Sequence, residues 1–371
     1  DRGEHAECEG KAREAAAALS RAGDDAAHAD ALRLAALCLC QQGRRKEAAH
    51  LAEEQHSRFR ERGAREGEAR MLLALSEANA LRRGPKKRME AFRTATDALR
   101  IFQELRDKKM QASVLLVMVN VYLKGLSSRS RQKSLQDAVE LAREALSLFQ
   151  VAGDERLQAE AMHALAAARI QAGSFEAGLR HAKEALQAYR RLGMARSEVR
   201  EGQCIAEWLL AARMPKQAQP YAEEALAVIR QLSCDSAWEA SAVGAVIQAL
   251  LARNELDDAL KTVTEATLKF QEGQDKQGEV LLLDVAVTVH LARGDHREAL
   301  HTAGQALELA RSLGRKGHEL ALQRAVAGLH LKLGDLDGAL EAAQASLALL
   351  PRAHGHADGA ACLDCLARVR R

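Results

Sequence analysis

Aromatic residues, prolines and long apolar runs are all scarce in this sequence. Aromatic side chains make up 3% of its 371 residues, and it contains four prolines. The longest apolar stretch, around 114–123, is interrupted by Asn120 and falls short of the roughly 18 residues that span a membrane. No window alternates apolar and polar residues over the length of a strand, so we predict no β-sheet. With Ala, Leu, Glu and Arg abundant, these absences indicate an all-α protein.

A strong charge of one sign is absent too, and so is a secretory signal. The formal net charge is +3, which favours neither nucleic acid nor an anionic membrane as a general partner. The seven cysteines are an odd number scattered over predicted helices, which suits a reducing compartment. We therefore expect a soluble protein of the cytoplasm, with the nucleus or an organelle interior after transit-peptide removal as alternatives.

What the sequence does contain is a repeat. Anchor residues at 173, 213, 254, 294 and 334 are 40 or 41 positions apart. Nine, twelve and thirteen residues after Gly294 stand Ala303, Ala306 and Leu307, and the other anchors are followed by similar residues. Apolar residues at i, i+3, i+4 and i+7 on both sides of each anchor predict two amphipathic helices joined by a turn. A fixed period of this length is typical of a solenoid.

The pattern resembles the tetratricopeptide repeat family in its long-helix form, whose unit is about 40 residues. The resemblance rests on Ala-x-x-Ala-Leu in the second helix and on a small residue five positions after the turn: Ala48, Gly178, Ala218, Ala259, Ala299 and Ala339. Ala138 takes the same place once an insertion of about eight residues, 126–133, is subtracted. It implies a right-handed superhelical α-solenoid of about eight antiparallel helix pairs with terminal capping helices. The usual aromatic positions of the family are missing, so we expect Ala, Leu and Val to fill the core.

We expect residues 1–371 to form one continuous solenoid domain. Residues 1–23 would be an N-terminal capping helix, residues 24–351 the eight helical hairpins, and residues 352–371 a C-terminal capping helix. The hairpins would span 24–63, 64–107, 108–153, 154–193, 194–233, 234–274, 275–314 and 315–351. Pro220 is expected to break or delay the second helix of the fifth hairpin.

Four potential metal ligands lie close together near the end of the chain: His354, His356, Cys362 and Cys365. Histidine and cysteine at this spacing are typical ligands of zinc or another soft metal. The alternative is that both cysteines are small core residues of the capping helix. We favour that alternative and predict neither a metal nor a cofactor.

Motifs of known catalytic chemistry are missing. There is no Gly-x-Ser-x-Gly elbow, no phosphate-binding Gly-Lys-Ser/Thr loop and no His-Glu-x-x-His. Paired acids such as Asp257 and Asp258 lie in predicted turns, where solvated charge needs no catalytic role. We therefore predict that the protein is not an enzyme.

Basic residues accumulate at the turns of the first three hairpins. They are Arg44, Arg45 and Lys46; Arg82, Arg83, Lys86, Lys87 and Arg88; and Arg129, Arg131 and Lys133. Because successive turns of a solenoid stack along one edge, we expect a basic edge that binds an acidic protein surface. Solvated turns are often charged without having a function. The helix dipole, however, disfavours cations at helix starts, so three basic turns in succession favour a partner-binding edge. RNA is a less favoured partner, because no aromatic residues are interleaved for base stacking.

The resemblance also implies a concave channel, lined by the first helix of each pair, that holds a peptide or a helix. Counting ten and six residues back from each turn predicts these lining residues: Arg33, Leu37, Ala74, Ala78, Leu115, Val119, His163, Ala167, Gln203, Glu207, Gln248, Asp284, Thr288 and Arg324. The channel would be apolar in the second and third repeats and polar after the fourth. The alternative is a register error of one residue, which would make the apolar members core.

The sequence thus favours a non-catalytic scaffold, adaptor or assembly subunit that binds a protein segment in its groove, along its basic edge, or both. The alternative is a regulatory or sensor module of a larger signalling or transcription protein. A third hypothesis, a metal- or redox-dependent protein, depends on the C-terminal histidines and cysteines.

Overall fold

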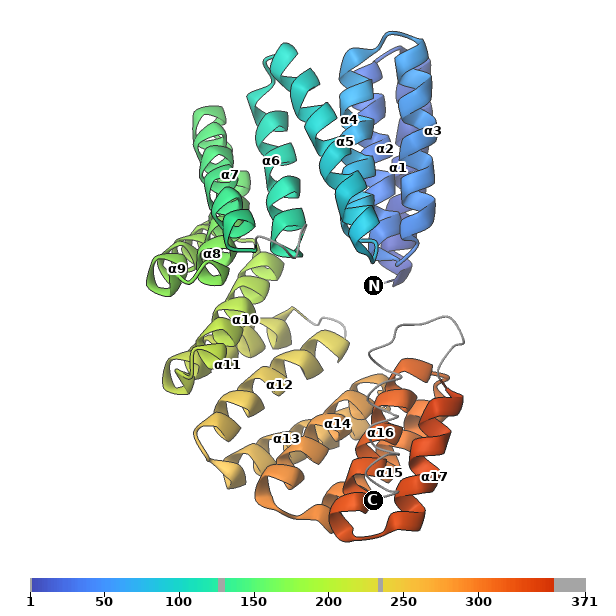
Figure 1. The fold of residues 1–371 in the computed structure, drawn as a ribbon, viewed down its shortest axis with the longest axis vertical. Helices are drawn as coiled ribbons and strands as arrows, with labels where there is room; N and C mark the ends of the chain where they lie inside the picture. The colour runs from blue at the N-terminus through green and yellow to red at the C-terminus, as the bar shows by residue number, and fades with distance from the viewer. Residues whose placement is uncertain (1, 126–130, 233–235, 350–371) are drawn as a thin grey trace. The chain divides into compact units, whose positions relative to one another are not determined.

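The computed structural model describes residues 2–125, 131–232 and 236–349 (Figure 1). Within these residues the regular secondary structure is α-helix throughout, in seventeen helices, α1 to α17, that pack as consecutive antiparallel pairs. The expected all-α helical-repeat architecture is therefore confirmed. The chain divides into two compact units, residues 1–194 and residues 195–371. Continuity of the solenoid from one unit to the next stays a prediction.

Unit 1 begins with a helix that packs against the first repeat, followed by four helix pairs. Its described helices are α1 (Arg2–Ala22), α2 (Asp25–Gln41), α3 (Arg45–Glu61), α4 (Arg65–Ala80), α5 (Pro85–Glu104), α6 (Lys108–Leu123), α7 (Arg131–Ala152), α8 (Glu155–Gln171) and α9 (Phe175–Arg191). The first helices of successive pairs, α2, α4, α6 and α8, also pack side by side.

Unit 2 repeats the arrangement over four more helix pairs. Its described helices are α10 (Ala195–Ala211), α11 (Pro215–Gln231), α12 (Ser236–Ala252), α13 (Leu256–Glu272), α14 (Lys276–Arg293), α15 (His296–Ser312), α16 (Lys316–Leu333) and α17 (Leu336–Ala348). Each hairpin interval expected from the sequence holds one of these pairs. The C-terminal capping helix expected at 352–371 lies outside the described residues.

The helix ends follow from local sequence. The side chain of Asp24 accepts a hydrogen bond from the Ala27 amide at 2.9 Å, and Asp107 caps α6 in the same way. The five anchor residues and the turn glycines of the first three hairpins, Gly43, Gly84 and Gly125, adopt positive φ, for example Gly294 at 84° and Asn254 at 62°. Glycine and asparagine tolerate this conformation, which ends one helix and lets the chain reverse into the next. The turn positions were therefore predictable from the sequence.

Ala, Leu and Val make up most of the buried core, as expected, but the core also holds a repeated aromatic position that the sequence analysis did not identify. A buried aromatic ring stands five residues before the N-cap of the next repeat in five of the repeats: Phe59, Phe102, Phe149, Tyr189 and Phe270. Phe59, Tyr189 and Phe270 each stand 16 residues after the turn residue of their repeat, and the insertions in the second and third repeats lengthen this spacing to 18 and 24 residues. Five of the eleven aromatic residues of the chain thus share one position near the end of the second helix.

Pro220 does not break its helix, which runs without interruption over Pro215–Gln231. Both Pro220 and Lys216, whose carbonyl lacks the usual i+4 donor, are exposed on the helix surface. Water can therefore hydrate the carbonyl that the proline leaves unpaired. Among the described helices, none is both long and apolar enough to cross a membrane.

Candidate partner-binding surface

Basic side chains collect at the turns between the two helices of the first three pairs, and we name this set the basic turn edge. Its described members are Arg44, Arg45, Lys46, Arg82, Arg83, Lys86, Lys87, Arg88, Arg131 and Lys133, to which the structure adds Lys124. Arg129, expected here as well, lies outside the described residues. The N-cap residues of α3 and α5, Arg44 and Gly84, make no side-chain capping bond. The partial positive charge of these helix starts therefore adds to that of the side chains.

Two hydrogen bonds between repeats hold the second and third turns together. The Arg88 side chain donates through Nε to the carbonyl oxygen of Gly125 at 2.9 Å. In return, Lys124 Nζ donates to the carbonyl oxygen of Ala80 at 3.2 Å. Each cation caps the backbone of the neighbouring repeat, so the two turns and their charges are fixed beside one another.

A cation from the first repeat is close to this pair. The pKa of Lys124 is lowered, mainly by partial burial and then by the positive charges of Arg45 and Arg88. One cation from each of three successive repeats therefore contributes to a single positive region. Sequence analysis did not identify Lys124, which directly precedes Gly125 just as Arg82 and Arg83 precede Gly84. That position before the turn glycine was the signal that could have found it.

The members of the basic turn edge differ in whether the protein already neutralises them. Arg44 is 2.6 Å from Glu47 and 3.1 Å from Glu9, and Lys87 is 2.5 Å from Glu90. The following basic residues have no carboxylate within 4 Å in the described part of the chain: Arg45, Lys46, Arg83, Lys86, Arg88, Lys124, Arg131 and Lys133. Most of the edge is thus open to an external anion.

The acidic turns of unit 2 behave differently. Arg293 pairs with Asp257 of the preceding repeat and lies 3.0 Å from Asp295. Asp335 caps α17 through the Gly338 amide at 3.0 Å and also bonds His330 Nδ1. These acids are used within the unit, as expected for carboxylates at helix starts. Contacts within the protein therefore account for the acidic turns of unit 2 but not for the basic turns of unit 1.

The apolar part of the predicted groove is wrong. Ala74, Ala78, Leu115 and Val119 are at most 2% exposed and belong to the hydrophobic core. The alternative of a register error of one residue is the better description for the second and third repeats.

The cause of that error is helix length. The first helices α4 and α6 have 16 residues, whereas α2 and α8 have 17. Counting nine and thirteen residues on from the N-cap leaves Arg33 and His163 in place and gives Leu73, Glu77, Leu116 and Asn120 in the second and third repeats. Glu77 and Leu116 are partly exposed and Asn120 is exposed, whereas Leu73 is fully buried, so this count corrects three of the four positions.

Apart from Leu37 and Ala167, the accessible groove positions are polar. Arg33 forms two hydrogen bonds to the Glu77 carboxylate, at 2.5 and 3.0 Å, which joins α2 to α4. Burial alone would lower the pKa of Arg33, but the Glu77 charge and hydrogen bond raise it overall. In unit 2, Gln203 accepts a hydrogen bond from Trp238 at 3.2 Å. The remaining predicted positions are at least partly exposed: Leu37, Ala167, Glu207, Gln248, Asp284, Thr288 and Arg324.

Comparison with solved structures agrees with this architecture. The quorum sensor NprR from B. thuringiensis in its apo form aligns with a TM-score of 0.55 and 11% identity, over 94% of this chain and 99% of that one. A Rap protein complexed with Competence and Sporulation Factor aligns at 0.50 and 14%, over 94% and 98%. Aspartyl phosphate phosphatase F from Bacillus subtilis aligns at 0.50 and 13%, over 79% and 73%.

The chain has the fold of the tetratricopeptide-like repeat proteins. No family model matches its sequence, and no curated protein matches it by sequence. At identities this low, the similarity to these solved structures concerns the fold alone, so the site must be argued from this chain's own residues.

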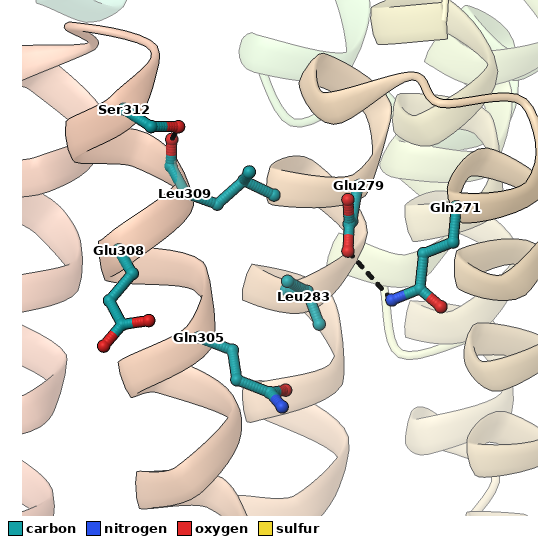
Figure 2. A pocket seen from close by; sticks show the side chains of 7 residues that line it. All are labelled: Gln271, Glu279, Leu283, Gln305, Glu308, Leu309 and Ser312. Carbon is teal, nitrogen blue, oxygen red and sulfur yellow. Dashed lines mark hydrogen bonds between the residues drawn. The ribbon is translucent and has the colours of Figure 1, made fainter.

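An open pocket lies between α13, α14 and α15 in unit 2 of this chain (Figure 2). Gln271 and Glu279 hydrogen-bond each other across one side at 2.8 Å, and the Ser312 hydroxyl donates to the Leu309 carbonyl at 2.8 Å. The Ser312 hydroxyl is thus bonded to a backbone carbonyl rather than to a base. In the described part of the chain no three His, Cys, Asp or Glu side chains gather as metal ligands. The candidates His354, His356, Cys362 and Cys365 lie outside it.

Proposed function

We propose that this protein is a non-catalytic protein-interaction scaffold that binds an acidic protein segment along the basic turn edge of unit 1. The observation that carries the proposal is the meeting of Arg45, Arg88 and Lys124, from three successive repeats, without a neutralising carboxylate. The positive charges of Arg45 and Arg88 act on Lys124, so an anionic partner bound beside Lys124 gains energy from all three at once.

A protein fits this edge better than a nucleic acid. The aromatic rings closest to it, Phe92 and Tyr122, pack edge-to-face against each other at 5.1 Å and are half-buried. They are therefore not free to stack on bases, which single-stranded nucleic acids require of a binding surface. Carboxylates on a partner segment need only the cations, which the edge supplies from exposed turns.

Charge reversal tests the proposal. The triple variant Arg45→Glu/Arg83→Glu/Lys86→Glu changes three exposed members of the edge that form no ion pair. Each lost charge pair contributes roughly 0.2–1 kcal/mol, so binding of a labelled oligoglutamate peptide should weaken on the order of tenfold. Fluorescence anisotropy at low and high salt measures this, and the wild-type affinity should fall as salt rises.

The matched control is Arg60→Glu/Arg93→Glu/Arg143→Glu, which reverses three exposed cations on the outer faces of α3, α5 and α7. It changes the net charge equally but leaves the turns intact, so it separates a local site from general attraction. Equal loss of affinity in both variants would refute a specific edge. Both variants are then used as bait in native extract. A stoichiometric protein partner of the edge should be lost with the edge variant and retained with the control.

A second candidate is a regulatory or sensor module. It is supported by the similarity in fold to a quorum sensor and to a Rap protein complexed with Competence and Sporulation Factor. In that case a short peptide would bind polar first-helix positions within one unit, such as Arg33 and His163 in unit 1, rather than the turns. Hydrogen exchange with peptide pools distinguishes the two, since protection would appear in first helices and survive reversal of the edge.

A further inference from the structure

Two cysteine side chains meet between the first two helices of unit 1. Cys8 of α1 and Cys38 of α2 lie thirty positions apart in the sequence, yet their sulfur atoms are 3.1 Å apart. Both are free thiols in the structure. A disulfide bond is about 2.05 Å long, so the two sulfurs need to approach by only about 1 Å to be joined.

The surroundings hold these two thiols opposite each other. Gln42, one turn beyond Cys38, donates through its side-chain amide to the His5 carbonyl at 3.1 Å and to Glu9 at 2.9 Å. These bonds join α1 to α2 on either side of Cys8 and fix the rotation of α1 about its axis. The close pairing of the sulfurs is therefore part of how the two helices pack.

We propose that Cys8 and Cys38 form a reversible disulfide by exchange with a low-molecular-weight disulfide such as oxidised glutathione. The Cys8 sulfur first attacks one sulfur of glutathione disulfide, giving a mixed disulfide and one reduced glutathione. Cys38 then loses its proton and attacks the Cys8 sulfur, releasing a second glutathione. The two protein thiols are oxidised and one glutathione disulfide is reduced to two thiols.

The order of these steps follows from exposure. Cys8 is half-buried, whereas Cys38 is only 5% exposed. Burial, together with the hydrogen bond to Cys8, raises the pKa of Cys38 to about 12. Cys38 is therefore a poor first nucleophile and reacts once the mixed disulfide places an electrophilic sulfur beside it. Cys40 is two positions along the helix, so it points to another side of α2 and does not compete.

The bond would act on the capping helix. α1 packs against α2 of the first repeat, with Ala12 and Ala16 buried. A covalent link to α2 closes the chain between the two cysteines and restricts the unfolded state. Oxidation should therefore fix the capping helix against the repeats and raise the melting temperature by several degrees.

The test uses the full chain incubated with defined ratios of oxidised to reduced glutathione, followed by digestion and mass spectrometry without reduction. Trypsin places Cys8 on peptide Gly3–Lys11 but leaves Cys38 and Cys40 together on Leu34–Arg44. The variant Cys40→Ser removes that ambiguity and should still give the cross-linked pair. The variant Cys8→Ser, changed at the more exposed position, should give neither the cross-link nor the rise in melting temperature.

A cross-link in wild type and Cys40→Ser, reversed by dithiothreitol, supports the proposal. Stable glutathionylation of Cys8 without the cross-link overturns it, because Cys38 would then be unable to reach the mixed disulfide. Recovery of free Cys8 and Cys38 under an excess of oxidised glutathione overturns it as well. This inference stands apart from the basic turn edge, since charge reversal there leaves both thiols unchanged.

Discussion

Single side chains in unit 1 connect local sequence to the stability of the repeats, and Asp154 is the clearest case. Its carboxylate accepts the Leu157 amide at 3.0 Å, which caps α8, and lies 2.8 Å from Lys109 Nζ of α6. Burial opposes ionisation, but these two partners outweigh it and lower the pKa of Asp154 overall. One residue thus begins a helix and joins two neighbouring repeats.

The lowered pKa predicts a dependence of stability on pH. Because the folded protein binds the Asp154 proton more weakly than the unfolded chain, the stabilisation is present above about pH 4 and is lost as pH falls through the folded pKa. Asp154→Asn keeps a capping side chain but loses the charge, so it should cost about 1 kcal/mol at neutral pH and decline less steeply in acid. Urea denaturation from pH 7 to 3 measures both effects. Asp258→Asn, at an exposed turn, should match wild type throughout.

The corrected register makes a second prediction at the residue scale. Leu115 is 2% exposed, whereas its neighbour Leu116 is only partly buried. Leu115→Ala should therefore lower the free energy of unfolding by about 3 kcal/mol, since it opens a cavity in the core. Leu116→Ala should cost about 1 kcal/mol. If chemical denaturation reversed this order, the original groove register would be right after all.

At the scale of the helix, two buried phenylalanines pack onto the start of the next repeat where glycine leaves room for them. A Cβ atom added to Gly278 would lie 2.6 Å from the ring of Phe270, and one added to Gly67 would lie 2.5 Å from Phe59. Real side chains do not approach this closely, so the ring would have to move. The aromatic residue that closes a hairpin and the small residue that opens the next are thus a packing pair.

Two alanine substitutions in unit 2 test that pair. Gly278→Ala should destabilise the protein by about 1–3 kcal/mol, because the new methyl group displaces a buried ring. Gly304→Ala in α15 meets no atom within 4 Å and should stabilise by about 0.5–1 kcal/mol, as alanine does inside helices. Thermal and urea unfolding followed by circular dichroism compare the two variants. Equal effects would mean that the Phe270 ring adjusts without loss.

For the whole molecule, the important feature is that each compact unit has its own turn charges. The unpaired cations belong to residues 1–194, and the acidic turns that pair internally belong to residues 195–371. We therefore expect the two fragments to fold separately, with helical spectra that sum to that of the full chain. Fragment 1–194 should retain most of the affinity for an oligoglutamate peptide, and fragment 195–371 should not bind it. Binding divided equally between folded fragments would contradict an edge confined to unit 1.

The amino-acid sequence by itself determined the class of fold, the hairpin boundaries and the turns. These depend on short-range physics: a helical period of apolar residues, an aspartate cap at Asp24 or Asp107, and positive φ at Gly294 or Asn254. Each of these signals lies within about twenty consecutive residues, and the repeat shows each of them several times.

Only the tertiary structure decided which side chains meet. Helix lengths of 16 or 17 residues changed the register of the predicted groove, and packing decided that the aromatic rings near the ends of the second helices are buried. The meeting of Lys124 with Arg45 and Arg88, and of Cys8 with Cys38, joins residues from different helices. Such contacts depend on packing angles and on one-residue differences in helix length. A periodic sequence pattern reveals neither.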